Sequence, residues 1–183
     1  MNYSILKKKN IQPGIWDGGK TFEYFIYPEN STYSERNFLF RISSASIEKV
    51  PSDFTKFSGF RRYLLMLDDS LEIIRNGAEE IYLEEEIFEF DSDDSIVSKS
   101  SGSDFNLMVA KSVHFSSVEI LSETKEINSD VIFLFAKTQT EISLENQKIE
   151  LEENDLLVIK NSNNELIRID SNQKIILALV KFL

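Results

Sequence analysis

The chain has 183 residues, of which 42% are hydrophobic and 28% charged, a composition typical of folded globular proteins that argues against disorder. Its formal net charge of −11 opposes binding to nucleic acid or to an anionic membrane surface, because such a chain repels phosphates. The absence of cysteine excludes disulfides, thiolate zinc sites and thiol nucleophiles.

No stretch of the sequence approaches the roughly 18 apolar residues that a membrane-spanning helix needs. Three lysines near the N-terminus, Lys7 to Lys9, are not followed by the apolar segment of a secretory signal. We therefore expect a cytoplasmic protein that has no membrane partner and binds no nucleic acid.

The first β-rich segment follows a pair of glycines, Gly18 and Gly19, which permit a tight turn or a close backbone approach. Residues 21–27 then consist mainly of β-forming residue types. The glycine pair belongs to no GxGxxG or P-loop pattern and no helix is indicated after it, so a nucleotide site is not predicted.

Two arginines interrupt otherwise apolar alternation in the next two predicted strands. Arg41 lies in the first of them, residues 38–47, and Arg62 in the second, residues 61–68. Successive side chains of a strand point to opposite faces, and neither strand has a cleanly polar side. Both arginines are therefore expected against a partly dry interior, where a guanidinium needs an anionic partner.

Two interpretations of these arginines stay open at this point. In the first, they form internal salt bridges, for which Glu23 is a candidate partner. In the second, an anionic ligand completes the charge pairing through forked hydrogen bonds to a guanidinium.

A strongly acidic stretch, residues 77–94, is interpreted as a solvated face or rim. After it, residues 102–115 alternate as another strand that places Asn106, Met108 and His114 on one face. His114 is the only histidine, so neither a histidine-ligated metal nor a Ser-His-Asp triad is indicated. No spacing of carboxylates singles out a glycosidase pair, and we expect no metal and no cofactor.

The second half of the chain repeats a hairpin pattern of the first. In both halves an apolar strand precedes the hairpin, and Ile81 in the first corresponds to Ile149 in the second. Long helical periodicity is missing, and strands separated by frequent turn signals are typical of a β-barrel or sandwich. We predict an all-β protein with little helix and two similar units.

Four segments, in the same order along the chain, together resemble the HutD/Ves family. They are Trp16–Gly19 with Thr21 and Glu23, Phe40–Ser43 with Ala45, Phe54–Arg62, and Asp104–Met108. The resemblance covers nearly the whole chain and implies a cupin-like double β-barrel, or bicupin, in agreement with the repeated hairpins. We accordingly place one cupin-like unit at residues 1–118 and the other at 119–183, packed as one compact body.

The resemblance also implies a ligand-binding site, because the polar positions that recur in the family map onto residues of this chain. These are Arg41, Ser43, Arg62 and Asn106, with Trp16, Gly19, Thr21 and Glu23 nearby, and we add Met108 from the last segment. The chain departs from the family pattern at Ser58, Arg61 and Asp68–Asp69, which leaves the fold expectation in place.

Function is less sharply indicated. The family resemblance implies no established reaction. It does imply a link to histidine utilisation, which holds for at least some members of the family. One hypothesis is a non-catalytic, regulatory protein that binds a small anionic carboxylate metabolite, either alone or as a homodimer. The alternative is a metal-independent cupin-type isomerase or lyase that acts on a small acid or sugar. A third hypothesis is an interaction module whose acidic rim meets a basic partner; the scarcity of histidine favours the first.

Overall fold

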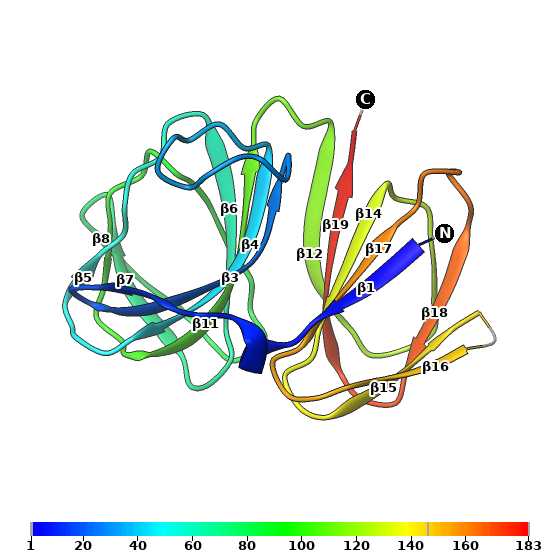
Figure 1. Ribbon diagram of the computed structural model, residues 1–183. Coiled ribbons are helices and arrows are strands. Elements are labelled where there is room, and N and C mark those ends of the chain that lie inside the picture. The colour runs from blue at the N-terminus through cyan, green and yellow to red at the C-terminus, as the bar shows by residue number, and fades with distance from the viewer. Residues whose placement is uncertain (1, 146, 183) are drawn as a thin grey trace. The chain divides into compact units, whose positions relative to one another are not determined.

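The structure, a computed structural model, describes residues 2–145 and 147–182. Among these residues it contains β-strands and one short 3₁₀ helix, η1 (Lys8–Asn10), so the all-β prediction is confirmed (Figure 1). The chain divides into two compact units. The central unit comprises Ile11–Ser112, and the terminal unit combines the described residues up to Asn10 with those from Val113 onward.

The central unit consists of two antiparallel sheets. The six-stranded sheet has the order β2 (Gly14–Trp16), β3 (Gly19–Tyr27), β4 (Phe40–Ile47), β11 (Gly102–Ala110), β6 (Phe60–Met66) and β9 (Phe88–Asp91). The four-stranded sheet has the order β5 (Ser52–Asp53), β10 (Ile96–Ser98), β7 (Leu71–Arg75) and β8 (Ala78–Tyr82). Apolar side chains from β6, β7, β9 and β10 form a core between them, as the alternation of these strands requires.

The terminal unit also consists of two antiparallel sheets. The five-stranded sheet has the order β1 (Asn2–Leu6), β17 (Leu156–Lys160), β14 (Val131–Phe135), β19 (Ile175–Lys181) and β12 (Phe115–Leu121). The four-stranded sheet has the order β13 (Lys125–Ile127), β18 (Ile167–Ser171), β15 (Thr140–Leu144) and β16 (Gln147–Leu151). Its interior is a large cluster of buried leucine, isoleucine and alanine side chains drawn from both sheets.

The N-terminal strand, β1, does not lie in the unit to which the sequence analysis assigned it. A boundary at residues 118 and 119 leaves β1 with the N-terminal half, whereas β1 pairs with β17 from Asn2 opposite Lys160 to Leu6 opposite Leu156 (Figure 1). Ile5 also packs against the apolar core of the terminal unit. The first and last strands of the described residues, β1 and β19, therefore belong to the same sheet.

The two units share one topology. The order β4-β11-β6-β9 of the central unit corresponds to β12-β19-β14-β17, and β5-β10-β7-β8 corresponds to β13-β18-β15-β16. The repeated hairpins of the sequence are thus β7–β8 and β15–β16, which occupy equivalent places in their sheets.

The alignment of Ile81 with Ile149 is wrong by one residue. The β7–β8 ladder pairs Ile73 with Glu80, and the β15–β16 ladder pairs Ile142 with Ile149. Ile149 is therefore the counterpart of Glu80. The exposed fractions agree, since Ile81 is 64% exposed and Ile149 only 5%. A shift of one residue moves a strand side chain to the opposite face.

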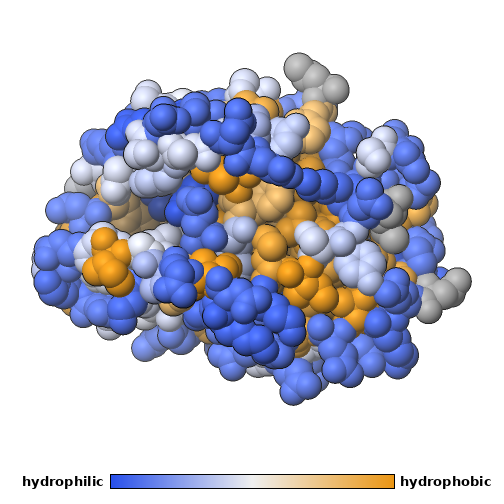
Figure 2. Space-filling model, in the orientation of Figure 1, coloured by the Kyte–Doolittle hydropathy of each residue, from blue (hydrophilic) through white to orange (hydrophobic). Residues whose placement is uncertain are grey.

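No helix among the described residues is long and apolar enough to cross a membrane. Hydrophilic residues cover much of the outer part of the face seen in Figure 2, as expected for a chain with 31 acidic and 20 basic residues.

Candidate functional site

Three neighbouring strands of the central unit, β4, β11 and β6, align the polar residues of the candidate site in rows. The first row is Arg41, Met108 and Arg62; the second is Ser43, Asn106 and Leu64; the third is Ala45, Asp104 and Met66. Because strands lie about 4.8 Å apart, the backbones that carry the two arginines are roughly 10 Å apart, with Met108 between them.

These rows form one wall of a cavity of about 480 Å³, a volume that suits a small organic ligand. All eight residues that were predicted to bind a ligand line it: Trp16, Thr21, Glu23, Arg41, Ser43, Arg62, Asn106 and Met108. Their alternation along the strands, two residues apart, is the reason that they share this face. The structure thus brings the predicted residues together, and their role in binding remains a prediction.

Gly19, which the resemblance placed near the site, does not line the cavity but allows two strands to approach closely. A Cβ atom at this position would lie 1.8 Å from the backbone oxygen of Ser46. The preceding carbonyl, that of Gly18, accepts hydrogen bonds from the N–H groups of Glu48 and Lys49, at 2.7 and 3.2 Å. These contacts tie the β2–β3 turn to the end of β4.

Arg41 forms the internal salt bridge considered from the sequence. Its Nε donates to Oε2 of Glu23 at 2.6 Å, and its Nη1 donates to the hydroxyl of Ser43 at 2.9 Å. The ring of Tyr33 lies against the guanidinium, with 4.5 Å between the ring centroid and Cζ. Arg41 is buried, so this carboxylate, hydroxyl and ring satisfy its charge in a dry setting.

Arg62 is buried without such compensation. Its Nη1 lies 3.5 Å from the carbonyl oxygen of Thr55, and its Nε has no hydrogen-bond partner among the described residues. The rings of Phe54 and Phe90 lie 5.5 and 5.1 Å from its Cζ. No carboxylate in the described part of the chain lies within 4.0 Å of it. Burial lowers the pKa of Arg62, opposed by Tyr33 and Asp104, but an arginine stays charged in a protein.

Asn106 and Asp104 supply the remaining polar groups of the cavity wall. The amide oxygen of Asn106 is buried and has no hydrogen-bond partner within the described ranges. Asp104 is 3% exposed, and its Oδ1 accepts a hydrogen bond from the backbone N–H of Ala45 at 3.2 Å. Burial raises the pKa of Asp104 to about 7, because the charged form is poorly solvated there.

The mouth of the cavity has a different character from its wall. Ile15 and Trp16 on β2 line it while remaining 72% and 38% exposed. The indole lies over Gly18, where an added Cβ would be 1.9 Å from Trp16 Cζ3. The cavity therefore has a polar, buried end and an apolar, exposed end.

The residues that line the cavity without having been predicted to do so include Tyr33, Phe54, Thr55 and Asp104. Asp104 could have been found, because it stands two residues before Asn106 on the same face of β11. The other three lie outside the long alternating strands, Tyr33 between β3 and β4 and the pair Phe54–Thr55 between β5 and β6, so no periodicity marks them.

The terminal unit contrasts with the central unit at the matching positions. When strand order and ladder register are followed, the counterparts of Arg62, Asp104 and Asn106 are Ile132, Ile175 and Leu177. All three counterparts belong to the buried apolar cluster of the terminal unit. The same topology thus encloses a polar cavity in one unit and a packed apolar core in the other.

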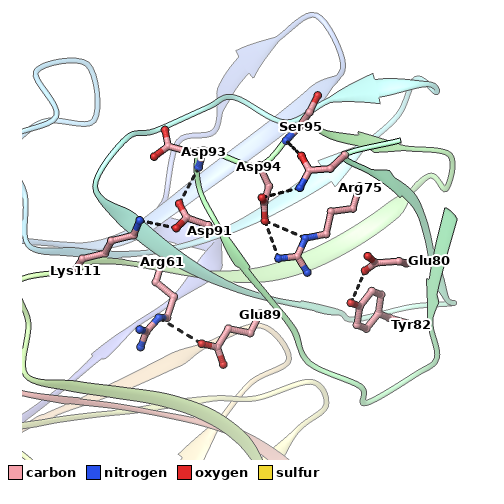
Figure 3. A network of polar contacts seen from close by, with 11 residues as sticks. Arg61, Arg75, Glu80, Tyr82, Glu89, Asp91, Asp93, Asp94, Ser95 and Lys111 are labelled. Carbon is pink, nitrogen blue, oxygen red and sulfur yellow. Dashed lines mark hydrogen bonds and ion pairs between the residues drawn. The ribbon is translucent and has the colours of Figure 1, made fainter. Parts of the chain in front are cut away.

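A second hollow in the central unit, of about 390 Å³, differs in that its cations are already paired (Figure 3). The ion pairs join Arg61 to Glu89, Arg75 to Asp94, and Lys111 to Asp91. Hydrogen bonds from Asn76 and Arg75 lower the pKa of Asp94 against the opposing effect of burial. This hollow therefore offers no uncompensated charge comparable to that of Arg62.

Within residues 2–145 and 147–182, no three His, Cys, Asp or Glu side chains come together in a way that could hold a metal ion. The polar groups that line the larger cavity are two guanidiniums, carboxyls, two amides and hydroxyls. Such a set suits recognition of an anion by charge and hydrogen bonds.

The fold and site define a cupin-like double β-barrel protein with a polar cavity in one barrel. The HutD family model matches residues 8–177, and the chain belongs to the HutD family. None of the curated proteins matches the sequence.

Solved structures share the fold at low sequence identity. HutD from Pseudomonas fluorescens SBW25 is 18% identical, with 98% of each chain covered and a TM-score of 0.83. A conserved protein of unknown function from Pseudomonas aeruginosa PAO1 is 21% identical, with 99% of this chain and 98% of that chain covered and a TM-score of 0.82. A cupin 2 conserved barrel protein from Leptotrichia buccalis is 10% identical, with coverages of 97% and 96% and a TM-score of 0.57.

Proposed function

We propose that this protein binds a small carboxylate metabolite in the cavity of its central unit and acts without catalysing a reaction. The observation that carries the proposal is Arg62, whose buried guanidinium faces the cavity with an unpartnered Nε and no carboxylate within 4.0 Å in the described chain. A buried charge of this kind is costly unless a partner completes it. A ligand carboxylate can do so through two parallel N–H···O bonds.

The proposal includes a regulatory role in histidine utilisation, which membership of the HutD family supports. A regulatory protein of this kind reports the concentration of a metabolite through binding alone. The site is consistent with that task, because it offers shape, charge and hydrogen bonds and its polar side chains come from three neighbouring, hydrogen-bonded strands.

The test begins with a thermal-shift screen of small carboxylates, including intermediates of histidine breakdown, on the purified protein. The acid that stabilises it most is then titrated by calorimetry into the wild type and into Arg62→Lys and Arg61→Lys variants. Lysine keeps the charge but cannot form the forked contact. We expect Arg62→Lys to weaken binding by about ten- to a hundredfold, the equivalent of roughly 1.5–3 kcal/mol.

Arg61 is the matched control for Arg62. It is adjacent in β6 and points to the opposite face, where its half-exposed side chain pairs with Glu89 at 3.3 Å (Figure 3). Its replacement by lysine should leave the affinity unchanged. Equal affinities of the two variants would show that Arg62 is structural and that the ligand lies elsewhere.

A second candidate function has one observation in its favour. Asp104 is a buried carboxyl group in the cavity whose pKa is raised to about 7, a value suited to general acid–base catalysis near neutral pH. A metal-independent isomerase or lyase could use it to move a proton on a bound acid or sugar. Incubating the protein with the ligand in deuterated water separates the two functions: a catalyst of this kind exchanges a carbon-bound hydrogen of the ligand, and a binding protein does not.

A further inference from the structure

The charges that line the cavity do not all cancel within the protein. Arg41 is neutralised by its salt bridge to Glu23, at 2.6 Å. Arg62 and Asp104 are the buried charged groups that remain, whereas Asp53, which also lines the cavity, is exposed. Within the described chain, Arg62 and Asp104 form no ion pair with each other. The charge that the cavity presents to a ligand therefore depends on whether Asp104 carries a proton.

The surroundings of Asp104 favour its protonated form. It stands on β11 between β4 and β6, and the only hydrogen bond that its carboxylate accepts within the described part of the chain comes from the backbone N–H of Ala45. The ionisable groups around it come from every neighbouring element: Arg41 on β4, Arg62 on β6, Asp68 after β6, and, along the cavity lining, Glu23 on β3, Asp53 on β5 and Tyr33 before β4. The arginines favour its charged form and Asp68 disfavours it, but burial outweighs them and raises its pKa to about 7.

We propose, as an extension that rests on the binding function above, that the cavity takes a singly charged carboxylate together with one proton, and that Asp104 holds this proton. The ligand carboxylate occupies the position facing Arg62, and the proton comes from the solvent. With Asp104 protonated, Arg62 is the one buried charge of the cavity wall that lacks a partner among the described residues, and a monocarboxylate neutralises it. With Asp104 ionised, the same ligand brings a second negative charge into a dry space.

Binding of the anion and protonation of Asp104 are consequently linked. Each favours the other by the same factor, because linkage between two binding events is reciprocal. The affinity for a monocarboxylate should be constant well below the pKa of Asp104 and should fall about tenfold for each pH unit above it. Asp104 thereby determines the charge class of the ligand, a role distinct from that of Arg62, which grips it.

Propionate is a suitable probe, because it is small, singly charged and does not titrate near neutral pH. It is titrated into ¹⁵N-labelled protein while the Nε–H resonance of Arg62 is followed by NMR at about pH 5.5, 7 and 8.5. Propionamide is the neutral analogue, and succinate, compared with propionate at about pH 6.5, is the analogue with a second charge. Asp104→Asn retains an oxygen that can accept from Ala45 N–H but cannot titrate.

We expect propionate to bind the wild type more than tenfold less tightly at about pH 8.5 than at about pH 7, and Asp104→Asn to bind it with one affinity at all three pH values. Propionamide and succinate should both bind more weakly than propionate. As a measurement that needs no variant, calorimetry in two buffers of different ionisation enthalpy should show uptake of close to one proton per propionate bound at about pH 8.

The outcomes separate this inference from the proposed function. Propionate binding that is independent of pH in the wild type, or succinate binding tighter than propionate, overturns the inference and leaves an anion-binding cavity in place. A pH dependence that persists unchanged in Asp104→Asn also overturns it. If no carboxylate shifts the Arg62 resonance at any pH, the proposed binding function itself is wrong.

Discussion

Replacement of Asp104 by asparagine should change how the stability of the protein depends on pH. In the wild type, burial raises the pKa of this carboxyl from an ordinary 3.8 to about 7. The folded state therefore holds a proton on Asp104 at pH values where the unfolded chain has released it. Stability from this group is fully present below the ordinary pKa and is lost as the pH rises toward the folded value. Asparagine does not titrate, so this loss disappears in the variant.

The size of the effect follows from the two pKa values. They differ by about 3 units. At about 1.4 kcal/mol per unit, the wild type loses up to about 4 kcal/mol through this group between about pH 4 and about pH 7. This is a large share of the stability of a typical domain, which is about 5–15 kcal/mol.

The assay is urea unfolding of both proteins at a series of pH values, with the free energy of unfolding of the variant subtracted from that of the wild type. The subtraction removes the contribution of all other ionisable groups. We expect the difference to fall as the pH rises from about 4 to about 7 and to be flat above that. A difference that is flat throughout, or that rises with pH, would refute the reasoning about Asp104.

Asp94→Asn provides a control of opposite sign. Hydrogen bonds from Asn76 and Arg75 lower the pKa of Asp94, so its contribution to stability is present above its ordinary pKa and is lost as the pH falls through the lowered value (Figure 3). The corresponding difference between wild type and variant should therefore rise with pH in the acid range. Curves of the same sign for both variants would contradict the assignment of causes.

Three further predictions concern packing, register and metal content. Gly19→Ala should lower the free energy of unfolding by more than about 2 kcal/mol, because its Cβ would lie 1.8 Å from the backbone oxygen of Ser46. Gly14→Ala is the control and should be tolerated, because the nearest contact of its Cβ would be at 3.8 Å. Similar urea midpoints for the two variants would contradict this prediction. Ile149→Ser should lower the free energy of unfolding by about 2–4 kcal/mol, and Ile81→Ser should lower it by less than about 0.5 kcal/mol. Equal losses would instead support the alignment of Ile81 with Ile149 that was expected from the sequence. Protein purified without added metal should contain far less than one equivalent of zinc, iron, manganese or nickel by elemental analysis, and a stoichiometric metal retained against chelator would disprove this.

The site was predictable to the extent that it depends on strand alternation. Arg41 and Arg62 are flanked by apolar or small residues at alternate positions, and this pattern alone placed both in a half-dry interior, where they lie. Alternation could not decide which of them is paired. That depends on Glu23, which faces Ser43 from the neighbouring strand just before a β-bulge in β3. A pairing of this kind is set by register across strands and not by local pattern.

The parts that were missed are nonlocal or irregular. β1 pairs with β17 although the paired residues are 150 to 158 positions apart in the sequence, and nothing in its five residues distinguishes that pairing from one nearby. The offset between the two hairpins was misjudged by one residue because Ile81 is apolar yet faces outward, 64% exposed. Tyr33, which stacks on Arg41, stands between strands, where side-chain direction has no period to reveal it.

The contrast between the two barrels has a consequence for engineering and for natural variation. Ile132, Ile175 and Leu177 show that the same topology accepts buried apolar side chains at these positions. Arg62, Asp104 and Asn106 are buried polar groups instead, and Arg62 Nε and Asn106 Oδ1 lack hydrogen-bond partners among the described residues. We therefore expect these three residues to lower the folding stability of the central unit. We expect isoleucine or leucine at these three positions to stabilise the central barrel and to abolish the proposed binding of a carboxylate. A selection for stabilised variants should therefore favour the loss of these three polar residues over substitutions elsewhere in the fold.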